Sequence, residues 1–291
     1  MAAALIILAT PSARGSSLSS SGSDVVAKRP AAVGKAVSGA APKKRATKHY
    51  GWHPDLPDAR DLLYAAPFAQ ITNLPAKADL RAKCPPVYDQ GQLGSCTGNA
   101  IAAAVEFIHQ PKFTPSRLFI YYNERVMEGT TVTDSGAQIR DGIKSVATLG
   151  VCPETDWGYD IKKFAVKPPA KAFTDALKTR ATRYYRVVQD IAQMRGCLAE
   201  GFPFVFGFTV YESFESTAMA KSGVMTMPSG KDKVVGGHAV MAVGYIDAEQ
   251  MIIVRNSWAA NWGIKGYFKM PYAYITSHRL ASDFWTIRQE T

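Results

Sequence analysis

Residues 89–96 read DQGQLGSC, and residues 97–109 continue as TGNAIAAAVEFIH. Eight of the thirteen residues after Cys96 are apolar. They cover almost every face of a helix, and a helix that is apolar all round is a buried one. The stretch therefore predicts a buried helix over about residues 96–109, with a cysteine at its start and a glycine-bearing loop directly before it.

The position of Cys96 has a chemical consequence. Only a thiolate attacks carbonyl groups efficiently, and a helix N-terminus stabilises negative charge through its dipole and its unpaired amides. Together with a histidinium partner, this position can lower a cysteine pKa from about 8.5 into the range of about 3.5 to 7.5. Cys96 alone also fits a small apolar residue that opens a helix, because buried free cysteines are common.

Two later segments favour the nucleophile. His238 follows two glycines and begins an apolar strand, and Asn256 ends the next strand eighteen residues later. An antiparallel pair of strands would bring Asn256 beside His238, where the amide oxygen accepts the Nδ1 proton and directs Nε2 toward Cys96. This is the order of orienting residue, base and nucleophile that thiol catalysis requires.

The predicted elements are helical first and extended afterwards. Beyond the helix at 96–109, helical patterns cover residues 118–126, a stretch that ends at Gly150, and residues 190–200. The predicted strands, which share apolar β-branched or aromatic runs between turn residues, are 183–188, 204–210, 238–245, 252–256 and 267–270. Such segregation predicts an α+β arrangement with a mainly helical lobe and a mainly sheet lobe.

The motifs resemble the papain family of cysteine peptidases, in particular its bacterial xylellain-type branch. The resemblance covers about residues 74–287, and its order is Gln-x5-Cys, a Gly-His-Ala strand and an Asn-Ser-Trp segment. It implies a papain-like two-lobed fold, with a mainly helical left lobe, an antiparallel, barrel-like right lobe and the active-site cleft between them. It also implies peptide hydrolysis through an acyl-enzyme.

The resemblance assigns a role to each matching position. Cys96 is the expected nucleophile, His238 the general base and then acid, Asn256 the orienting residue and Gln90 an oxyanion donor. Gln90 lies six residues before Cys96, so a tight loop can return its amide beside the backbone N–H of Cys96. Loss of one such donor typically lowers kcat by roughly 10² to 10³. Trp258 matches the indole that covers the histidine–asparagine hydrogen bond.

Five positions are expected to bind substrate. Ser135, Gly136 and Ala137 are similar to the family's glycine segment, whose backbone pairs with an extended peptide by strand addition. Ser135 also fits the N-cap of the following helix. Gly237, which stands where papain has an aspartate, and Trp258 complete the set.

Composition limits the partners. With 291 residues, 47% hydrophobic and 20% charged, the chain is of ordinary globular composition, which excludes a collagenous or multi-span membrane protein. The formal charge is +10, but residues 1–50 hold eight basic residues against one acidic residue. Because the remainder is nearly neutral, we expect no binding of nucleic acid. No apolar run is long enough to span a membrane. We also expect a monomer, and the resemblance implies peptide or protein substrates.

The cysteines predict neither a metal site nor a disulfide framework. No pair has C-x-x-C spacing, and no cofactor is expected. We expect Cys84, Cys152 and Cys197 to be structural thiols. Leu93 stands where the family usually has a cysteine, so one of its disulfides is absent. A Cys-His acyltransferase or transglutaminase and an inactive peptide-binding homologue stay as alternatives, although the former usually has an acidic orienting residue.

The domain boundaries follow composition. Residues 1–48 lack aromatic residues and predict a flexible basic tail, whose apolar start is a degraded signal or has no function, so the compartment stays open. Residues 49–73 predict an extended, pro-like segment, and residues 74–291 the peptidase domain. We hypothesise that part of residues 31–73 crosses the cleft and makes the chain an autoinhibited zymogen, with a linker or targeting tail as the alternative.

Overall fold

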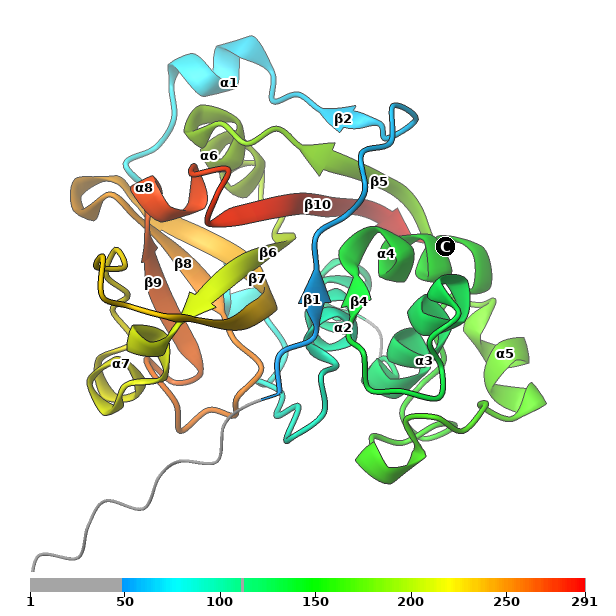
Figure 1. Ribbon diagram of the computed structural model, residues 1–291. Helices are drawn as coiled ribbons and strands as arrows, with labels where there is room; N and C mark the ends of the chain where they lie inside the picture. Colours follow the sequence, from blue (N-terminus) through cyan, green and yellow to red (C-terminus); the bar gives the residue numbers. More distant parts are fainter. Residues whose placement is uncertain (1–48, 111–112, 291) are drawn as a thin grey trace, which may run out of the picture. The chain divides into compact units, whose positions relative to one another are not determined.

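The buried helix predicted at Cys96 is α2 (Cys96–His109), and it lies at the junction of the helices and the sheet (Figure 1). The computed structural model describes residues 49–110 and 113–290. On one side α2 packs against α3 (Arg117–Glu128) and α4 (Ile139–Leu149), and on the other against strands β7 (Val234–Ile246) and β10 (Ala281–Glu290). The predicted start and burial of the helix are therefore confirmed.

Capping residues fix the ends of the neighbouring helices. The hydroxyl of Ser116 caps α3 by accepting from the Phe119 amide at 3.1 Å, and Gly129 ends the helix in the left-handed conformation. Gly150 ends α4 with φ of 76°. Ser135 does not cap α4, because the residue at the N-cap is Gln138, so that alternative was wrong.

The main sheet has eight strands in the described residues, and its order is β2-β5-β10-β6-β7-β8-β9, with β3 added to β7. The strands are β2 (Leu63–Tyr64), β3 (Lys77–Asp79), β5 (Ala181–Val187), β6 (Phe204–Tyr211), β7 (Val234–Ile246), β8 (Met251–Arg255), β9 (Tyr267–Pro271) and β10 (Ala281–Glu290). All neighbours are antiparallel except β2 and β5. Separately, β1 (Trp52–His53) pairs in parallel with β4 (Ala137–Gln138).

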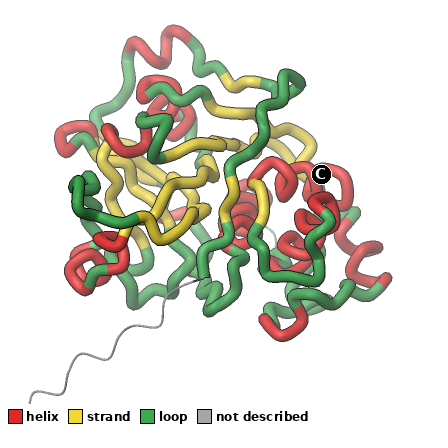
Figure 2. Tube along the Cα trace, in the orientation of Figure 1, coloured by secondary structure: helices red, strands yellow, loops and turns green. Residues whose placement is uncertain are grey.

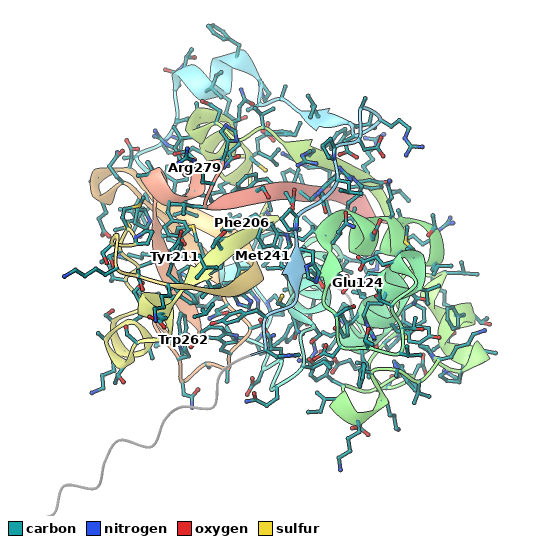
Figure 3. The ribbon with its side chains drawn as sticks, in the orientation of Figure 1. Glu124, Phe206, Tyr211, Met241, Trp262 and Arg279 are labelled. Carbon is teal, nitrogen blue, oxygen red and sulfur yellow. The ribbon has the colours of Figure 1, made fainter. Side chains whose placement is uncertain are left out.

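The two faces of the sheet carry two cores because side chains alternate along each strand. On β6, Phe206 and its alternate neighbours belong to the large aromatic cluster on one face. On β7, Ala239, Met241 and Val243 face α2 and join the second cluster. Phe206 and Met241 are labelled on these two strands in Figure 3.

Figure 2 shows several helices on the right of the strands and further helices at the top and lower left. The remaining elements are short. They are α1 (Phe68–Thr72), α5 (Ala170–Ala176), α6 (Ile191–Ala199), α7 (Thr217–Ser222), α8 (Tyr272–Ile275) and the 3-10 turns η1 (Arg81–Lys83), η2 (Ile161–Lys163), η3 (Glu212–Glu215) and η4 (Asp247–Glu249). The predicted helices and strands are present, so the α+β class is confirmed. The extended form predicted for residues 49–73 was wrong in part, because α1 lies within it.

All described residues belong to one compact unit of the chain. Within them, no helix combines the length and the apolar character that crossing a bilayer demands. The tail predicted over residues 1–48 lies outside the described residues.

Candidate active site

The thiol of Cys96 is fully buried at the N-terminus of α2. Burial raises its pKa to about 12, although hydrogen bonds from the backbone amides of Ala239, Gly51 and Thr97 act in the opposite direction. The predicted lowering of the Cys96 pKa is therefore wrong for this state. The physical reason is that residues of the N-terminal segment lie against the sulfur and exclude water.

Antiparallel pairing of β7 and β8 brings His238 and Asn256 together, and both side chains are buried. The Nε2 atom of His238 lies 2.9 Å from Oδ1 of Asn256. The predicted use of the two ring nitrogens was therefore wrong, because the ring turns Nε2 rather than Nδ1 toward Asn256. The backbone of Ala239, the residue after His238, lies against the Cys96 sulfur. The predicted nucleophile and the predicted base are therefore neighbours in space.

Aromatic rings enclose the imidazole of His238. The indole of Trp258 stacks on it with ring centroids 5.1 Å apart, and Tyr50 and Phe208 approach edge-on at 5.9 and 5.7 Å. A hydrogen bond in such a low-dielectric enclosure is stronger than the same bond in water. Trp258 thus lies where it shields the bond between His238 and Asn256.

Gln90 is fully buried, and the segment around Ser257 fixes its side chain. The Gln90 amide donates to the Ser257 carbonyl at 2.9 Å, and the Ser257 hydroxyl donates to Oε1 of Gln90 at 2.7 Å. The Nε2 atom of Gln90 donates to the carbonyl oxygens of Leu93, at 3.0 Å, and His49, at 3.4 Å. The sequence analysis missed Ser257, whose position between Asn256 and Trp258 was the available signal.

The predicted substrate-binding segment holds a peptide, and that peptide belongs to this chain. The amide of Ala137 donates to the carbonyl of Gly51 at 2.7 Å, and Trp52 lies opposite Ala137 in the β1–β4 pair (Figure 1). A Cβ at Gly136 would lie 2.2 Å from the Gly51 oxygen, so only glycine fits there. The Ser135 carbonyl accepts from Nε2 of His53.

Trp52 packs against glycines of the sheet. A Cβ at Gly207 would lie 1.9 Å from the Trp52 ring, and a Cβ at Gly237 would lie 2.6 Å from the Trp52 carbonyl oxygen. The indole Nε1 donates to Oδ2 of Asp283 at 3.2 Å. Gly237 therefore lies beside the docked Trp52. Gly207 and Asp283 are contacts that the sequence analysis missed because they depend on β6 and β10 meeting at this point.

This fold, with a cysteine at the start of a buried helix and a histidine–asparagine pair on the neighbouring sheet, is that of a cysteine peptidase. The chain belongs to the papain family of cysteine proteases, whose family model matches residues 74–284.

Three similar proteins illustrate the relationship. Xylellain, a cysteine protease from Xylella fastidiosa, is 45% identical with a TM-score of 0.78, over 86% of this chain and 99% of that chain. An uncharacterised peptidase C1-like protein of Acanthamoeba polyphaga mimivirus is 41% identical, over 84% of this chain and 88% of that protein. Chymopapain of Carica papaya is 30% identical, over 70% of this chain and 56% of its own length. The predicted papain-like fold and xylellain-type resemblance are confirmed.

The bond between Ser257 and Gln90 gives a first test. We expect Ser257→Ala to lower kcat for a peptide amide about 3- to 10-fold with little change in KM, since one net hydrogen bond contributes roughly 0.5–1.5 kcal/mol. This expectation follows if Gln90 has its predicted role as an oxyanion donor, which binds the transition state more strongly than the substrate. Initial rates measure both constants. Ser222→Ala, at the exposed end of α7, is the matched control, and an effect on KM alone would contradict this role.

Proposed function

We propose that Cys96 is the nucleophile of this cysteine peptidase, that it cleaves within extended peptides, and that the chain's own residues 49–73 hold it inactive as a zymogen. The observation that carries the proposal is the docking of Gly51 in the site, where its carbonyl accepts from the Ala137 amide at 2.7 Å and its backbone lies against Cys96.

In the open site, His238 takes the thiol proton, and the Cys96 thiolate attacks the carbonyl carbon of the substrate. The oxyanion of the tetrahedral intermediate accepts from Nε2 of Gln90 and from the Cys96 amide. The imidazolium of His238 then gives its proton to the leaving amine, and an acyl-enzyme remains. Water, deprotonated by His238, attacks the thioester, and the acid product leaves with the thiol restored. Asn256 keeps the imidazole oriented through Nε2.

The contacts of residues 49–53, here called the inhibitory strip, support inhibition rather than cleavage. The sulfur of Cys96 meets an N–H group of the strip, and a thiolate attacks a carbonyl carbon instead. The Gly51 carbonyl is turned to the Ala137 amide at 2.7 Å. Gly51 is also enclosed on its Cα side, since a Cβ would lie 1.6 Å from the Gly94 oxygen.

Buried charge pairs hold the following residues, 54–73, away from the sulfur. The guanidinium of Arg140 on α4 binds Asp61 through two nitrogens, at 3.0 and 2.5 Å, and both side chains are more than nine-tenths buried. Arg186 on β5 bridges Asp61 at 3.2 Å and Asp283 at 3.0 Å. Asp55 accepts from the Trp285 indole at 2.8 Å. Breaking such pairs leaves uncompensated buried charge, which supports firm docking.

The proposed partners are extended peptides or proteins. Parallel pairing of β1 with β4 at Ala137 and Gln138 supports binding of an extended chain beside Gly136 by strand addition. We propose that the chain is a monomer and that its folded part has no affinity for nucleic acid, because most of the formal excess of basic residues lies in residues 1–50. Steeply salt-dependent DNA binding by residues 49–291 would contradict the second part.

Substitution of the nucleophile tests the central assignment. We expect Cys96→Ala to abolish both peptide hydrolysis and labelling by a thiol-directed epoxide, because no other group replaces the sulfur. Cys197→Ala, which alters a thiol that is equally buried on α6, is the control and should keep both. Mass spectrometry locates the label, and labelling spread evenly over several cysteines would reject Cys96.

Gly51→Ala tests inhibition by the strip. The added methyl group overlaps the Gly94 backbone, and overpacking typically costs roughly 1–3 kcal/mol, so the docked state loses population. We expect the full-length variant to react with iodoacetamide at Cys96 about 10-fold faster than the wild type.

Gly158→Ala is the matched control, because its Cβ would lie at an ordinary 3.5 Å from the Glu154 oxygen. Equal labelling rates in Gly51→Ala and the wild type would show that the strip does not limit access to the thiol.

The docking should depend on pH through Asp55. Burial and the neighbouring charge of Asp283 raise the Asp55 pKa from 3.8 to about 6, against the effects of Trp285 and Arg140. The docked state binds the Asp55 proton more tightly than the undocked state. Asp55 therefore makes its full contribution to the stability of the docked state below about pH 4, and this contribution is lost as the pH rises through about 6.

Asp55→Asn copies the neutral form. We expect this variant to label at Cys96 more slowly than the wild type at pH 7.5, by about 10-fold, and at nearly the same rate at pH 4.5. The ratio of the two rates at each pH cancels the titration of the thiol itself. A ratio that stays constant from pH 4.5 to 7.5 would remove Asp55 from the control of docking.

A further inference from the structure

One carboxylate connects the two glycine segments that border the site. The Gly94 amide, two residues before Cys96, lies 3.1 Å from both Oδ1 and Oδ2 of Asp134. The hydroxyl of Tyr121 donates to Oδ1 of Asp134, and the same hydroxyl accepts from the Gly136 amide at 3.1 Å. A continuous path of hydrogen bonds therefore runs from the nucleophile loop to the peptide-binding strand.

We propose that Asp134 and Tyr121 are positioning residues, which together form a clasp that fixes Gly94 and Gly136 relative to each other. Through Gly94 the clasp sets the position of the loop that carries Cys96. Through Gly136 it sets the strand whose next residue, Ala137, pairs with the peptide backbone. The inference rests on the proposed binding of peptides along Gly136 and Ala137.

Tyr121 is held as such a role requires. It is fully buried on α3, where the Arg125 guanidinium lies 4.0 Å from the ring centroid. Arg125 also donates to the carbonyl oxygens of Thr131 and Thr133, at 2.9 and 3.0 Å, and so orders the loop before Asp134. Burial and the hydrogen bond to Asp134 raise the pKa of Tyr121, so its hydroxyl keeps the proton that it donates.

The position of α3 is itself fixed relative to the nucleophile. A Cβ at Gly98, in the first turn of α2, would lie 2.8 Å from the Arg117 carbonyl and 3.2 Å from Tyr121. This close approach sets the distance from Tyr121 to the start of α2. Because the clasp includes Tyr121, the contact between α2 and α3 helps to fix both Gly94 and Gly136.

The inhibitory strip uses the same carboxylate. Nδ1 of His49 lies 2.5 Å from Oδ2 of Asp134, and the Asp134 side chain is about one-fifth exposed. The bonds to Gly94 and Tyr121 come from residues outside the strip, so they persist when the strip leaves. Asp134 therefore serves the docked state and the open state with different sets of donors.

Hydrogen exchange of the full-length chain tests the clasp without any need for activity. We expect Tyr121→Phe to increase exchange in residues 134–138, since the Gly136 amide loses its acceptor. Asp134→Asn should increase exchange there and also in residues 92–96. Tyr122→Phe, on the same helix, is the control, because its hydroxyl makes no hydrogen bond to Gly94 or Gly136 in the described residues. Unchanged exchange in both segments would overturn the proposal.

Kinetics separate positioning from a merely structural role. In full-length protein under conditions where the wild type hydrolyses peptides, we expect Tyr121→Phe to raise KM about 3- to 10-fold at nearly constant kcat. Asp134→Asn should also lower kcat, for a total loss of about 10- to 100-fold in kcat/KM, because a charged acceptor is lost. A falling melting temperature without this split would indicate a structural role and overturn the proposal.

A double-mutant cycle completes the test. Because the two side chains act through one path, Tyr121→Phe should have a much smaller effect in the Asp134→Asn background than in the wild type. Additive effects would overturn the clasp. An inactive wild-type chain would instead count against the proposed peptidase mechanism, and hydrogen exchange would still decide the clasp.

Discussion

The site depends on the close approach of α2 to β7. Small side chains make this approach feasible, since Ala100 and Ala103 on the helix face Ala239 and Met241 on the strand. The contact lets the Ala239 amide reach the sulfur of Cys96, although the two residues lie far apart in the sequence. Bulkier side chains on either surface would separate the helix from the sheet, and His238 would then lie too far from the thiol to share its proton.

Burial opposes ionisation of Cys96 in the docked state. It raises the pKa of the thiol from 9.0 to about 12. A helix N-terminus contributes only about 0.3–1 kcal/mol to an exposed charge and cannot offset this desolvation. The favourable dipole of α2 can therefore act on the thiolate only when water and a charged partner replace the strip. Displacement of the strip therefore both exposes the Cys96 thiol and allows it to ionise.

The sequence predicted what local patterns encode. The apolar run after Cys96, the glycines before His238 and the end of the strand at Asn256 are local signals. In the structure His238 pairs with Asn256, and the next residue, Ala239, lies against Cys96. Which nitrogen of His238 meets Asn256 depends on a side-chain rotamer, and no periodicity encodes a rotamer. The contact of Trp52 with Asp283 depends on β1 meeting β10 across 231 residues, which motif spacing cannot reveal.

The predicted domain boundary at residue 73 marks the place where the family motifs begin. The residues just before it nevertheless pack against the predicted peptidase domain. Residues 63–64 extend the main sheet as β2, and Asp61 compensates the buried guanidinium of Arg140. The inhibitory strip is held at the site by backbone pairing of Gly51 with Ala137, by side-chain hydrogen bonds of His49 and Trp52 with Asp134 and Asp283, and by glycine walls that allow close approach. An unpaired buried charge costs several kcal/mol. Withdrawal of residues 49–53 alone leaves the Arg140–Asp61 pair intact, whereas removal of the whole segment breaks it, so the two parts differ in energy although they are contiguous in sequence.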